Sequence, residues 1–185
     1  AYWKPVQAGG LAHSDSDVVR ELNAHPQCTI HPEAFRLHTA ASPHVAAQID
    51  GVDMGLNDFT PPDSTRLLIE TAGGVMSPMT SQHTVADVVA HHGWATVLVV
   101  QHYLGSINHT LAAVENLRSR GVNLLGLIIN GESSADSERF ICDYAQVRVL
   151  ARVPHLTALN RDNIALAAKH LRMQLAPELT PWINT

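Results

Sequence analysis

The first residues that could do chemistry follow a short apolar segment at the start of the sequence. Lys4 comes after Tyr2-Trp3 and before the glycine pair Gly9-Gly10. A lysine that leaves a strand next to a glycine-rich turn can present its ammonium group to a phosphate. Glycine pairs also mark ordinary turns, so a surface lysine beside a plain turn is the alternative interpretation.

A carboxylate ends another apolar segment. Glu70 closes Arg66–Glu70 and precedes Gly73 and Gly74. A carboxylate at the end of a buried strand costs free energy unless it is paired or binds a cation, and Mg²⁺ bridged to nucleotide phosphates is one such cation. The two glycines would let a ligand approach the backbone closely. A solvated strand-end glutamate is the alternative.

Two more polar groups lie later in the chain. The turn Gly105–Asn108 opens a helix-like segment, and Ser106 within it is a good N-cap residue. The free N–H groups of a helix N-terminus suit a carboxylate or phosphate. Asn130 ends the apolar run Leu124–Asn130, and its amide could read a purine edge with one donor and one acceptor. Simple capping and a simple turn are the alternatives.

These residues need a scaffold that brings separate segment ends together. Short runs rich in β-branched residues predict the strands Arg66–Glu70, Ala95–Val100, Leu124–Asn130 and Val147–Val153, with Tyr2–Gln7 as a fifth candidate. Apolar residues at helical spacing predict the helices Thr84–His92, Ser106–Arg120, Ser137–Tyr144 and Asn163–Leu175. The alternation predicts an α/β fold with a mostly parallel sheet and helices on both faces. Ligands bind beyond the carboxyl ends of such strands, so the polar residues should converge on one edge.

The stretch His25–Pro62 is predicted to be irregular, with one short helix at His44–Ile49, because prolines and glycines interrupt it. Several of the 12 histidines lie there. No two histidines have the His-x-x-x-His spacing of a helical zinc site, so we expect surface or packing histidines.

Length, net charge and cysteine content indicate the number of domains, the kinds of partner and the location of the protein. A length of 185 residues predicts a single domain spanning 1–185. The net charge of −5 argues against a nucleic-acid partner and against an anionic membrane surface. The apolar runs are too short to span a membrane, and no signal peptide is visible. Two distant cysteines, Cys28 and Cys142, favour a reducing, cytoplasmic location.

Seven short motifs, in order along most of the chain, resemble those of the dethiobiotin synthetase family. They are Tyr2–Gln7, Ser16-Asp17, Ser42-Pro43-His44, Glu70–Gly74 with Pro78, Leu104–His109, Asn130 and Val153-Pro154. Their shared order is far more specific than any single motif.

The resemblance implies a P-loop NTPase-like fold and an ATP-dependent cyclo-ligase that acts in biotin biosynthesis. Its substrates would be 7,8-diaminononanoate and CO2, and its cofactors ATP and Mg²⁺. The reaction would pass through a carbamate and a mixed carbamic-phosphoric anhydride before ring closure. The site would lie at a homodimer interface.

The resemblance also implies roles for individual residues. Lys4 would be catalytic and would neutralise charge on the carbamate and the γ-phosphate. Asp17 and Glu70 would hold Mg²⁺. The remaining roles are substrate binding by Ser42, Pro43, Gly73, Gly74, Gly105, Ser106, Ile107 and Asn108, and nucleotide binding by Asn130, Pro154 and Glu70.

The sequence also departs from the family pattern. The family begins with a strand, a Gly-x-x-x-x-Gly-Lys-Thr loop and a helix, which these 185 residues lack, so we expect an N-terminally incomplete domain without its first βα unit. Thr71 replaces a glycine, and Asp50–Arg66 is too short for a full helix before the strand. Two alternatives therefore stay open. One is a P-loop-less subunit or non-catalytic relative that needs a partner chain, and the other is a related ATP-dependent amide-forming ligase.

Overall fold

The computed structural model describes residues 1–23, 25 and 27–175 and has an α/β fold. The chain divides into two compact units, Ala1–His92 and Gly93–Thr185. Each unit is described by itself below. The single domain over residues 1–185 stays a prediction.

The first unit contains two pairs of parallel strands. β1 (Tyr2–Trp3) pairs with β4 (Leu68–Ile69), and β2 (Val6–Ala8) pairs with β3 (Phe35–Leu37). The predicted strand Tyr2–Gln7 is therefore divided between β1 and β2.

Proline explains this division. Pro5 has no N–H to donate to a neighbouring strand, so continuous pairing stops there. Before this point, Trp3 faces Ile69 of β4 and Tyr2 bridges Ile30 on the other side. After it, Val6 faces Phe35 of β3, and the pairing with β4 has ended. Lys4 lies between the two pairings, at the carboxyl end of β1.

The helices of the first unit are short: α1 (Asp15–Leu22), α2 (Pro43–Asp50), the 3-10 helix η1 (Leu56–Asp58) and α3 (Val85–His92). The predictions at Thr84–His92 and His44–Ile49 are confirmed. No sequence prediction covered α1. Among the described residues between Asp50 and Arg66, η1 is the only helix, in agreement with the expectation that this segment is too short for a full one.

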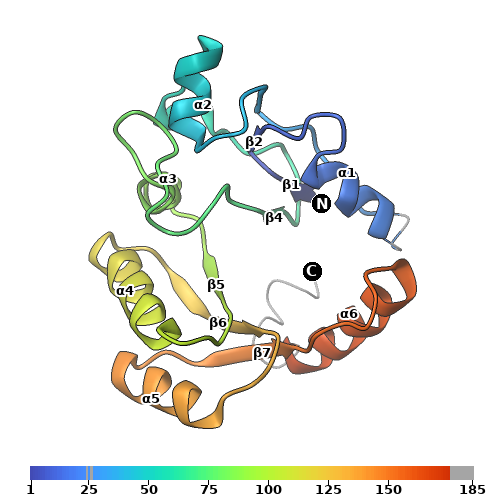
Figure 1. Ribbon diagram of the computed structural model, residues 1–185, viewed down its shortest axis with the longest axis vertical. Helices are drawn as coiled ribbons and strands as arrows, with labels where there is room; N and C mark the ends of the chain where they lie inside the picture. The colour runs from blue at the N-terminus through green and yellow to red at the C-terminus, as the bar shows by residue number, and fades with distance from the viewer. Residues whose placement is uncertain (24, 26, 176–185) are drawn as a thin grey trace. The chain divides into compact units, whose positions relative to one another are not determined.

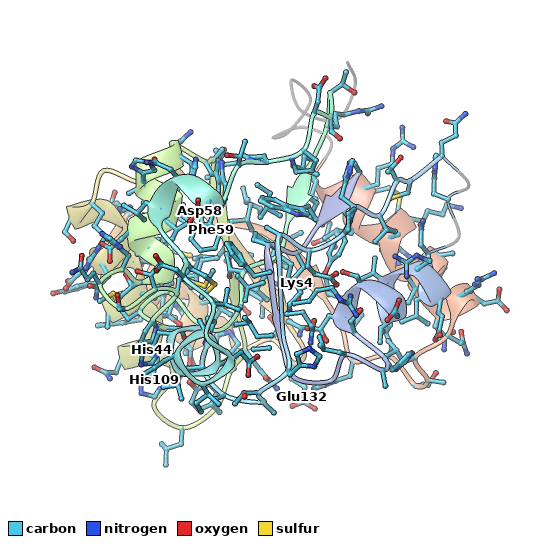
Figure 2. All side chains as sticks on the ribbon, turned by 90° about the horizontal axis from the view of Figure 1, so that it is seen from above. Lys4, His44, Asp58, Phe59, His109 and Glu132 are labelled. Carbon is cyan, nitrogen blue, oxygen red and sulfur yellow. The ribbon has the colours of Figure 1, made fainter. Side chains whose placement is uncertain are left out.

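Aromatic side chains form much of the interior of the first unit. Trp3 and Phe59 are buried, and the rings of Phe59 and Phe35 meet edge to face with centroids 5.7 Å apart. Figure 2 labels Phe59 beside Asp58 on the segment that contains η1. The Trp3 indole N–H donates to the Pro32 carbonyl at 3.1 Å, which ties the irregular stretch to β1.

The second unit alternates strands and helices. Its elements are β5 (Thr96–Val100), α4 (Ser106–Ser119), β6 (Leu124–Asn130), α5 (Ala135–Ala145), β7 (Val149–Val153) and α6 (Arg161–Leu175). The strands form one parallel sheet in the order β5-β6-β7. Each predicted strand and helix of this unit is confirmed to within three residues at either end.

The core of the second unit lies between the sheet and two helices. Leu127 and Ile129 of β6 pack with Val114 of α4 and Ile141 of α5 in one buried cluster. Figure 1 shows α4 and α5 along the sheet and α6 following β7. Within the described residues, no helix is both long enough and apolar enough to cross a membrane.

Candidate active site

Lys4 places a buried cation in the first unit. Its residue is 7% exposed, and its ammonium group forms ion pairs with the carboxylate of Asp15 and, at 2.9 Å, with Oε1 of Glu70. The register of β1 and β4 explains the contact of Lys4 with Glu70. Trp3 faces Ile69, and the residues that follow them at the ends of the two strands are Lys4 and Glu70. Figure 2 shows Lys4 among the side chains of this unit.

Both oxygens of Glu70 accept a bond. Lys4 donates to Oε1, and the phenol of Tyr2 donates to Oε2 at 2.7 Å. Burial, together with the hydrogen bond to Glu70, holds the pKa of Tyr2 well above its ordinary value, so this phenol stays a donor. Burial alone would lower the pKa of Lys4, but hydrogen bonds to Asp15 and Glu70 outweigh it, and the net pKa is raised.

The carboxylates around Lys4 remain open to solvent. The side chains of Asp15 and Glu70 are 52% and 45% exposed, whereas that of Lys4 is 9% exposed. A ligand could therefore reach the carboxylate oxygens from outside. Oxygen donors of this kind suit Mg²⁺, which takes one or two carboxylates in addition to substrate phosphates. The described residues contain no group of three or more His, Cys, Asp or Glu side chains that could form an all-protein metal cage.

Asp17 has other partners. Its Oδ2 accepts from the Ser14 N–H at 2.9 Å and from the Ser14 hydroxyl at 2.8 Å, which forms a capping box at the start of α1. Oδ1 accepts from Arg20. These bonds, led by the backbone N–H of Ser14, lower the pKa of Asp17 to about 2. Asp15 is therefore the aspartate of this segment that contacts Lys4, and the sequence analysis missed it.

The turn after Glu70 requires glycine at one position. Gly73 has φ of +87°, and a Cβ there would lie 2.5 Å from the Ser77 hydroxyl oxygen. The Thr71 hydroxyl donates to the Gly73 carbonyl at 3.4 Å, so the replacement of the family's glycine by threonine is accommodated within the turn.

A second close approach joins the Gly9-Gly10 turn to the segment that leads to Ser42. A Cβ at Gly9, which has φ of +71°, would lie 2.6 Å from the Cβ of Ala40.

The predicted residues Ser42 and Pro43 lie at the start of α2. Pro43 occupies its first turn, where the missing N–H of proline costs nothing, and the Ser42 hydroxyl forms a hydrogen bond with Nδ1 of His44 at 3.1 Å.

The start of α4 differs by one residue from the expectation. The N-cap is Gly105, with φ of +99°, and not Ser106, which is buried in the first turn. The Ser106 N–H donates to the Tyr103 carbonyl at 2.9 Å, so the backbone itself turns into the helix. The predicted residues Ile107 and Asn108 then lie in the first helical turn, whose N–H groups point out of the helix.

The two predicted nucleotide-binding segments of the second unit lie side by side. Asn130 at the end of β6 faces Val153 of β7, and the Gly131 N–H donates to the Val153 carbonyl at 2.8 Å. A Cβ at Gly131 would lie 3.0 Å from Nε2 of His155, so the chain passes close to Pro154 and its neighbour.

The structure thus brings together some of the predicted residues in each unit, and within the described part of each unit no hydrogen bond or ion pair joins Ser42, Pro43 or Gly105–Asn108 to them. Lys4 and Glu70 meet in the first unit, and Asn130 and the Pro154 segment meet in the second. The convergence of both groups on one site stays a prediction.

Comparison with known proteins identifies the family. A model described as "AAA domain" matches residues 1–163. The chain is similar to three proteins that are each named ATP-dependent dethiobiotin synthetase BioD. That of Rhodopseudomonas palustris strain BisA53 is 44% identical over 167 residues, which are 90% of this chain and 78% of the relative. That of Chlamydia pneumoniae is 50% identical over 169 residues, 91% of this chain and 75% of the relative. That of Bradyrhizobium sp. strain BTAi1 is 43% identical over 180 residues, 95% of this chain and 86% of the relative. With this identity along nine-tenths of its length, the chain belongs to the dethiobiotin synthetase family.

Proposed function

We propose that this chain carboxylates 7,8-diaminononanoate with CO2 and closes the ureido ring of dethiobiotin, with ATP as the phosphoryl donor. The observation that carries the proposal is the buried ammonium group of Lys4, held by the half-exposed carboxylates of Asp15 and Glu70, in a chain of this family. A buried cation at the end of a parallel strand suits a reaction in which negative charge accumulates on transferring oxygens.

The proposed reaction has three steps. One amine of the substrate adds to CO2 and loses a proton, which gives a carbamate. A carbamate oxygen attacks the γ-phosphorus of ATP, the bond from that phosphorus to the β,γ-bridging oxygen breaks, and ADP leaves. The second amine attacks the carbamoyl carbon, expels inorganic phosphate and loses a proton as the ring closes. Such a sequence depends on positioning and charge neutralisation.

In this proposal Lys4 neutralises the carbamate and the γ-phosphoryl oxygens. Glu70 would hold Mg²⁺ together with an aspartate, and the ion would neutralise charge on the nucleotide phosphates. The sequence-based hypothesis names Asp17 as that aspartate. The contact of Asp15 with Lys4 favours Asp15 instead.

The remaining site residues are proposed on the same basis. Ser42, Pro43, Gly73 and Gly74 line the diamine and carbamate end, and the close approaches at Gly9 and Gly73 support compact turns there. Gly105–Asn108 receive the carboxylate tail of the diamine, and Asn130 with Pro154 binds adenine. The pairing of β6 with β7 beside Asn130 supports this last assignment.

The working form and location are proposed too. The family resemblance supports a homodimer with its site at the interface, and the two free cysteines, Cys28 and Cys142, fit a reducing cytoplasm. The acidic net charge of −5 favours small molecules over nucleic acid or anionic membrane as partners.

Turnover of the intact natural protein tests the function. ATP, Mg²⁺, bicarbonate and 7,8-diaminononanoate should yield ADP, phosphate and a product with the mass of dethiobiotin, and omission of the diamine or bicarbonate should stop ADP release. ADP release that depends on ammonia and a carboxylate substrate would point to the amide-forming ligase. ATP turnover with neither, or none at all, would reject the proposal.

A further inference from the structure

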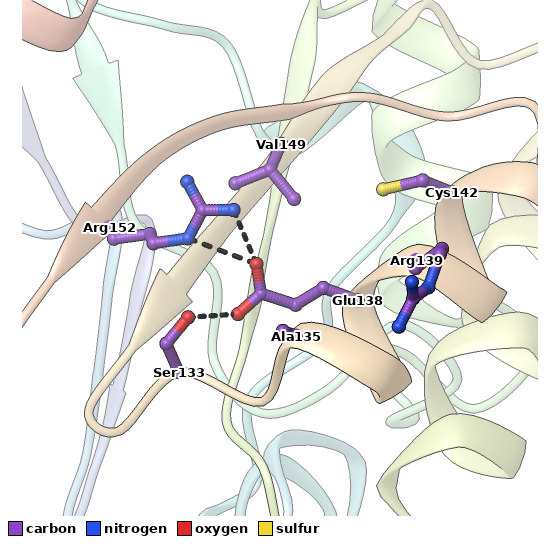
Figure 3. Close-up of a pocket in the computed structure, with 7 residues that line it drawn as sticks. All are labelled: Ser133, Ala135, Glu138, Arg139, Cys142, Val149 and Arg152. Atoms are coloured by element: carbon purple, nitrogen blue, oxygen red, sulfur yellow. Dashed lines mark hydrogen bonds and ion pairs between the residues drawn. The ribbon is translucent and has the colours of Figure 1, made fainter.

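The proposed chemistry does not use Glu138, a buried carboxylate in the first turn of α5. The residue is 5% exposed, and both of its oxygens are occupied. Oε1 accepts from the Ser133 hydroxyl and, at 3.1 Å, from the Ser134 N–H. Oε2 accepts from Nε and Nη2 of Arg152 at 2.9 and 2.5 Å (Figure 3).

These partners come from segments that lead to and from the proposed nucleotide-binding residues. Ser133 lies three residues after Asn130, in the loop that leaves β6. Arg152 lies on β7, two residues before Pro154. A single carboxylate therefore joins the β6 exit loop to the end of β7.

Arg152 is also held from its other side. Its backbone N–H donates to Oε1 of Gln174 at 2.9 Å, and its carbonyl accepts from Nε2 of the same side chain at 3.0 Å. The backbone of Arg152 is thus fixed by the sheet and by α6, which leaves the bidentate bond to Glu138 to fix its side chain.

The exit of β5 lies against the same carboxylate. Nε2 of His102 is 3.5 Å from Oε1 of Glu138, and neither of the two ring nitrogens, which are both buried, has a hydrogen-bond partner. His102 lies three residues before Gly105, the N-cap of α4. The ends of β5, β6 and β7 therefore meet around Glu138.

Glu138 is held as an anion. Burial alone would raise its pKa, but the bonds from Arg152, Ser133 and Ser134 outweigh burial and lower it. Loss of Arg152 would leave the charge of Glu138 without compensation, because the Glu138 side chain is only 6% exposed, whereas the Arg152 side chain is half exposed and keeps contact with water. Glu138 and Arg152 also line a pocket of about 410 Å³, into which a released Arg152 side chain could move (Figure 3).

We infer that Glu138 is a positioning residue for the adenine end of the nucleotide site. It fixes the loop that follows Asn130, through Ser133 and Ser134, and the end of β7 that precedes Pro154, through Arg152. The inference rests on the proposed function. It assigns Glu138 no contact with substrate: the residue acts through the backbone that carries Asn130.

The test compares Glu138→Gln with wild type in the intact natural protein. A glutamine must turn its NH2 either toward the Arg152 donors or toward the Ser134 N–H, so at least one donor of the network loses its acceptor. We expect the Kd of a non-hydrolysable ATP analogue to rise by up to about tenfold, because the free energy of a lost charged hydrogen bond within the protein is the upper limit of the effect on binding. The Kd of inorganic tripolyphosphate, which has no adenine, should stay the same. The KM for ATP should rise with kcat nearly unchanged.

Glu115→Gln is the matched control, since Glu115 is exposed on α4 of the same unit. Ser133→Ala removes one hydrogen bond only, so it should raise the Kd of the ATP analogue less than Glu138→Gln does. If Glu138→Gln does not fold, the Kd of Ser133→Ala tests the inference. An unchanged Kd in the folded variants, an equal loss of ATP-analogue and tripolyphosphate binding, or a fall in kcat alone would overturn the inference. Failure of wild type to bind ATP would instead reject the proposed function.

Discussion

At the scale of single residues, Lys4 is defined by what surrounds it. Two carboxylates compensate a charge that would otherwise be costly to bury, and the Tyr2 phenol holds the second oxygen of Glu70. In the proposed reaction the carbamate and phosphate oxygens would compete for the same ammonium group. The cluster therefore keeps a cation at the strand end before the substrates arrive.

Replacement of Glu70 tests the proposed metal role. Glu70→Gln keeps the shape of the side chain but removes its charge, so the Tyr2 and Lys4 contacts lose their anionic acceptor. We expect kcat to fall at least about a hundredfold, as when an electrostatic stabiliser is removed from other active sites. Circular dichroism and thermal unfolding should stay close to wild type, since the side chain is half exposed. Wild-type turnover would remove Glu70 from the site.

Asp15 and Asp17 can be separated by a pair of variants. Asp15 contacts Lys4, whereas Asp17 caps α1, so Asp15→Asn should reduce turnover and raise the Mg²⁺ concentration needed for half-maximal rate. Asp17→Asn should change both quantities less. Titration of Mn²⁺ binding by electron paramagnetic resonance provides a readout that does not depend on turnover. The opposite order of effects would support the sequence-based assignment of Asp17.

At the scale of elements, α1 shows how a short polar helix is stabilised. The Ser14–Asp17 capping box satisfies N–H groups that the helix itself leaves free. α1 in turn carries Asp15 at its first position, so the cap sets where that carboxylate lies relative to Lys4.

The cap should make stability depend on pH. The pKa of Asp17 is about 2 in the folded state against 3.8 in a model compound, so its contribution is present above pH 3.8 and is lost as pH falls through about 2. Asp17→Asn should therefore destabilise the protein at pH 7 and by roughly half as much at pH 3, which lies between the two pKa values. Urea unfolding at both pH values without Mg²⁺ measures this, with the exposed Asp53→Asn as control. An equal loss at both values would contradict it.

Strong patterns in the sequence predicted some elements, and other elements depended on contacts that spacing does not reveal. The continuous apolar run Leu124–Asn130 gave the exact bounds of β6. The polar sequence of α1 has no such run, and its signal was the serine–aspartate spacing of the capping box. β3 has only three residues, so periodicity could not detect it.

The candidate site was predictable to a similar degree. The pairing of Lys4 with Glu70 followed from polar residues at strand ends, since parallel strands bring such ends together. The sequence could not show that Asp15 and not Asp17 contacts Lys4, because two aspartates two residues apart fit the same motif. The bond of Glu138 to Arg152 joins residues 14 positions apart and had no local signal.

At the scale of the whole molecule, the proposed function assigns residues of both units to one nucleotide. Lys4 belongs to Ala1–His92, and Asn130 belongs to Gly93–Thr185. If both serve one nucleotide, each unit contributes to the same binding free energy. A change in either unit should then weaken the affinity for ATP.

Two variants test this convergence. Lys4→Gln removes the cation expected at the phosphates, and Asn130→Ala removes the amide expected at adenine, so each should raise the Kd of a non-hydrolysable ATP analogue about tenfold in calorimetry. Stoichiometry should stay at one nucleotide per chain in both. Lys169→Gln, an exposed lysine on α6, is the control and should bind as wild type. An unchanged Kd in Asn130→Ala would separate the second unit from the nucleotide, and Lys4 would then act without the proposed adenine contact.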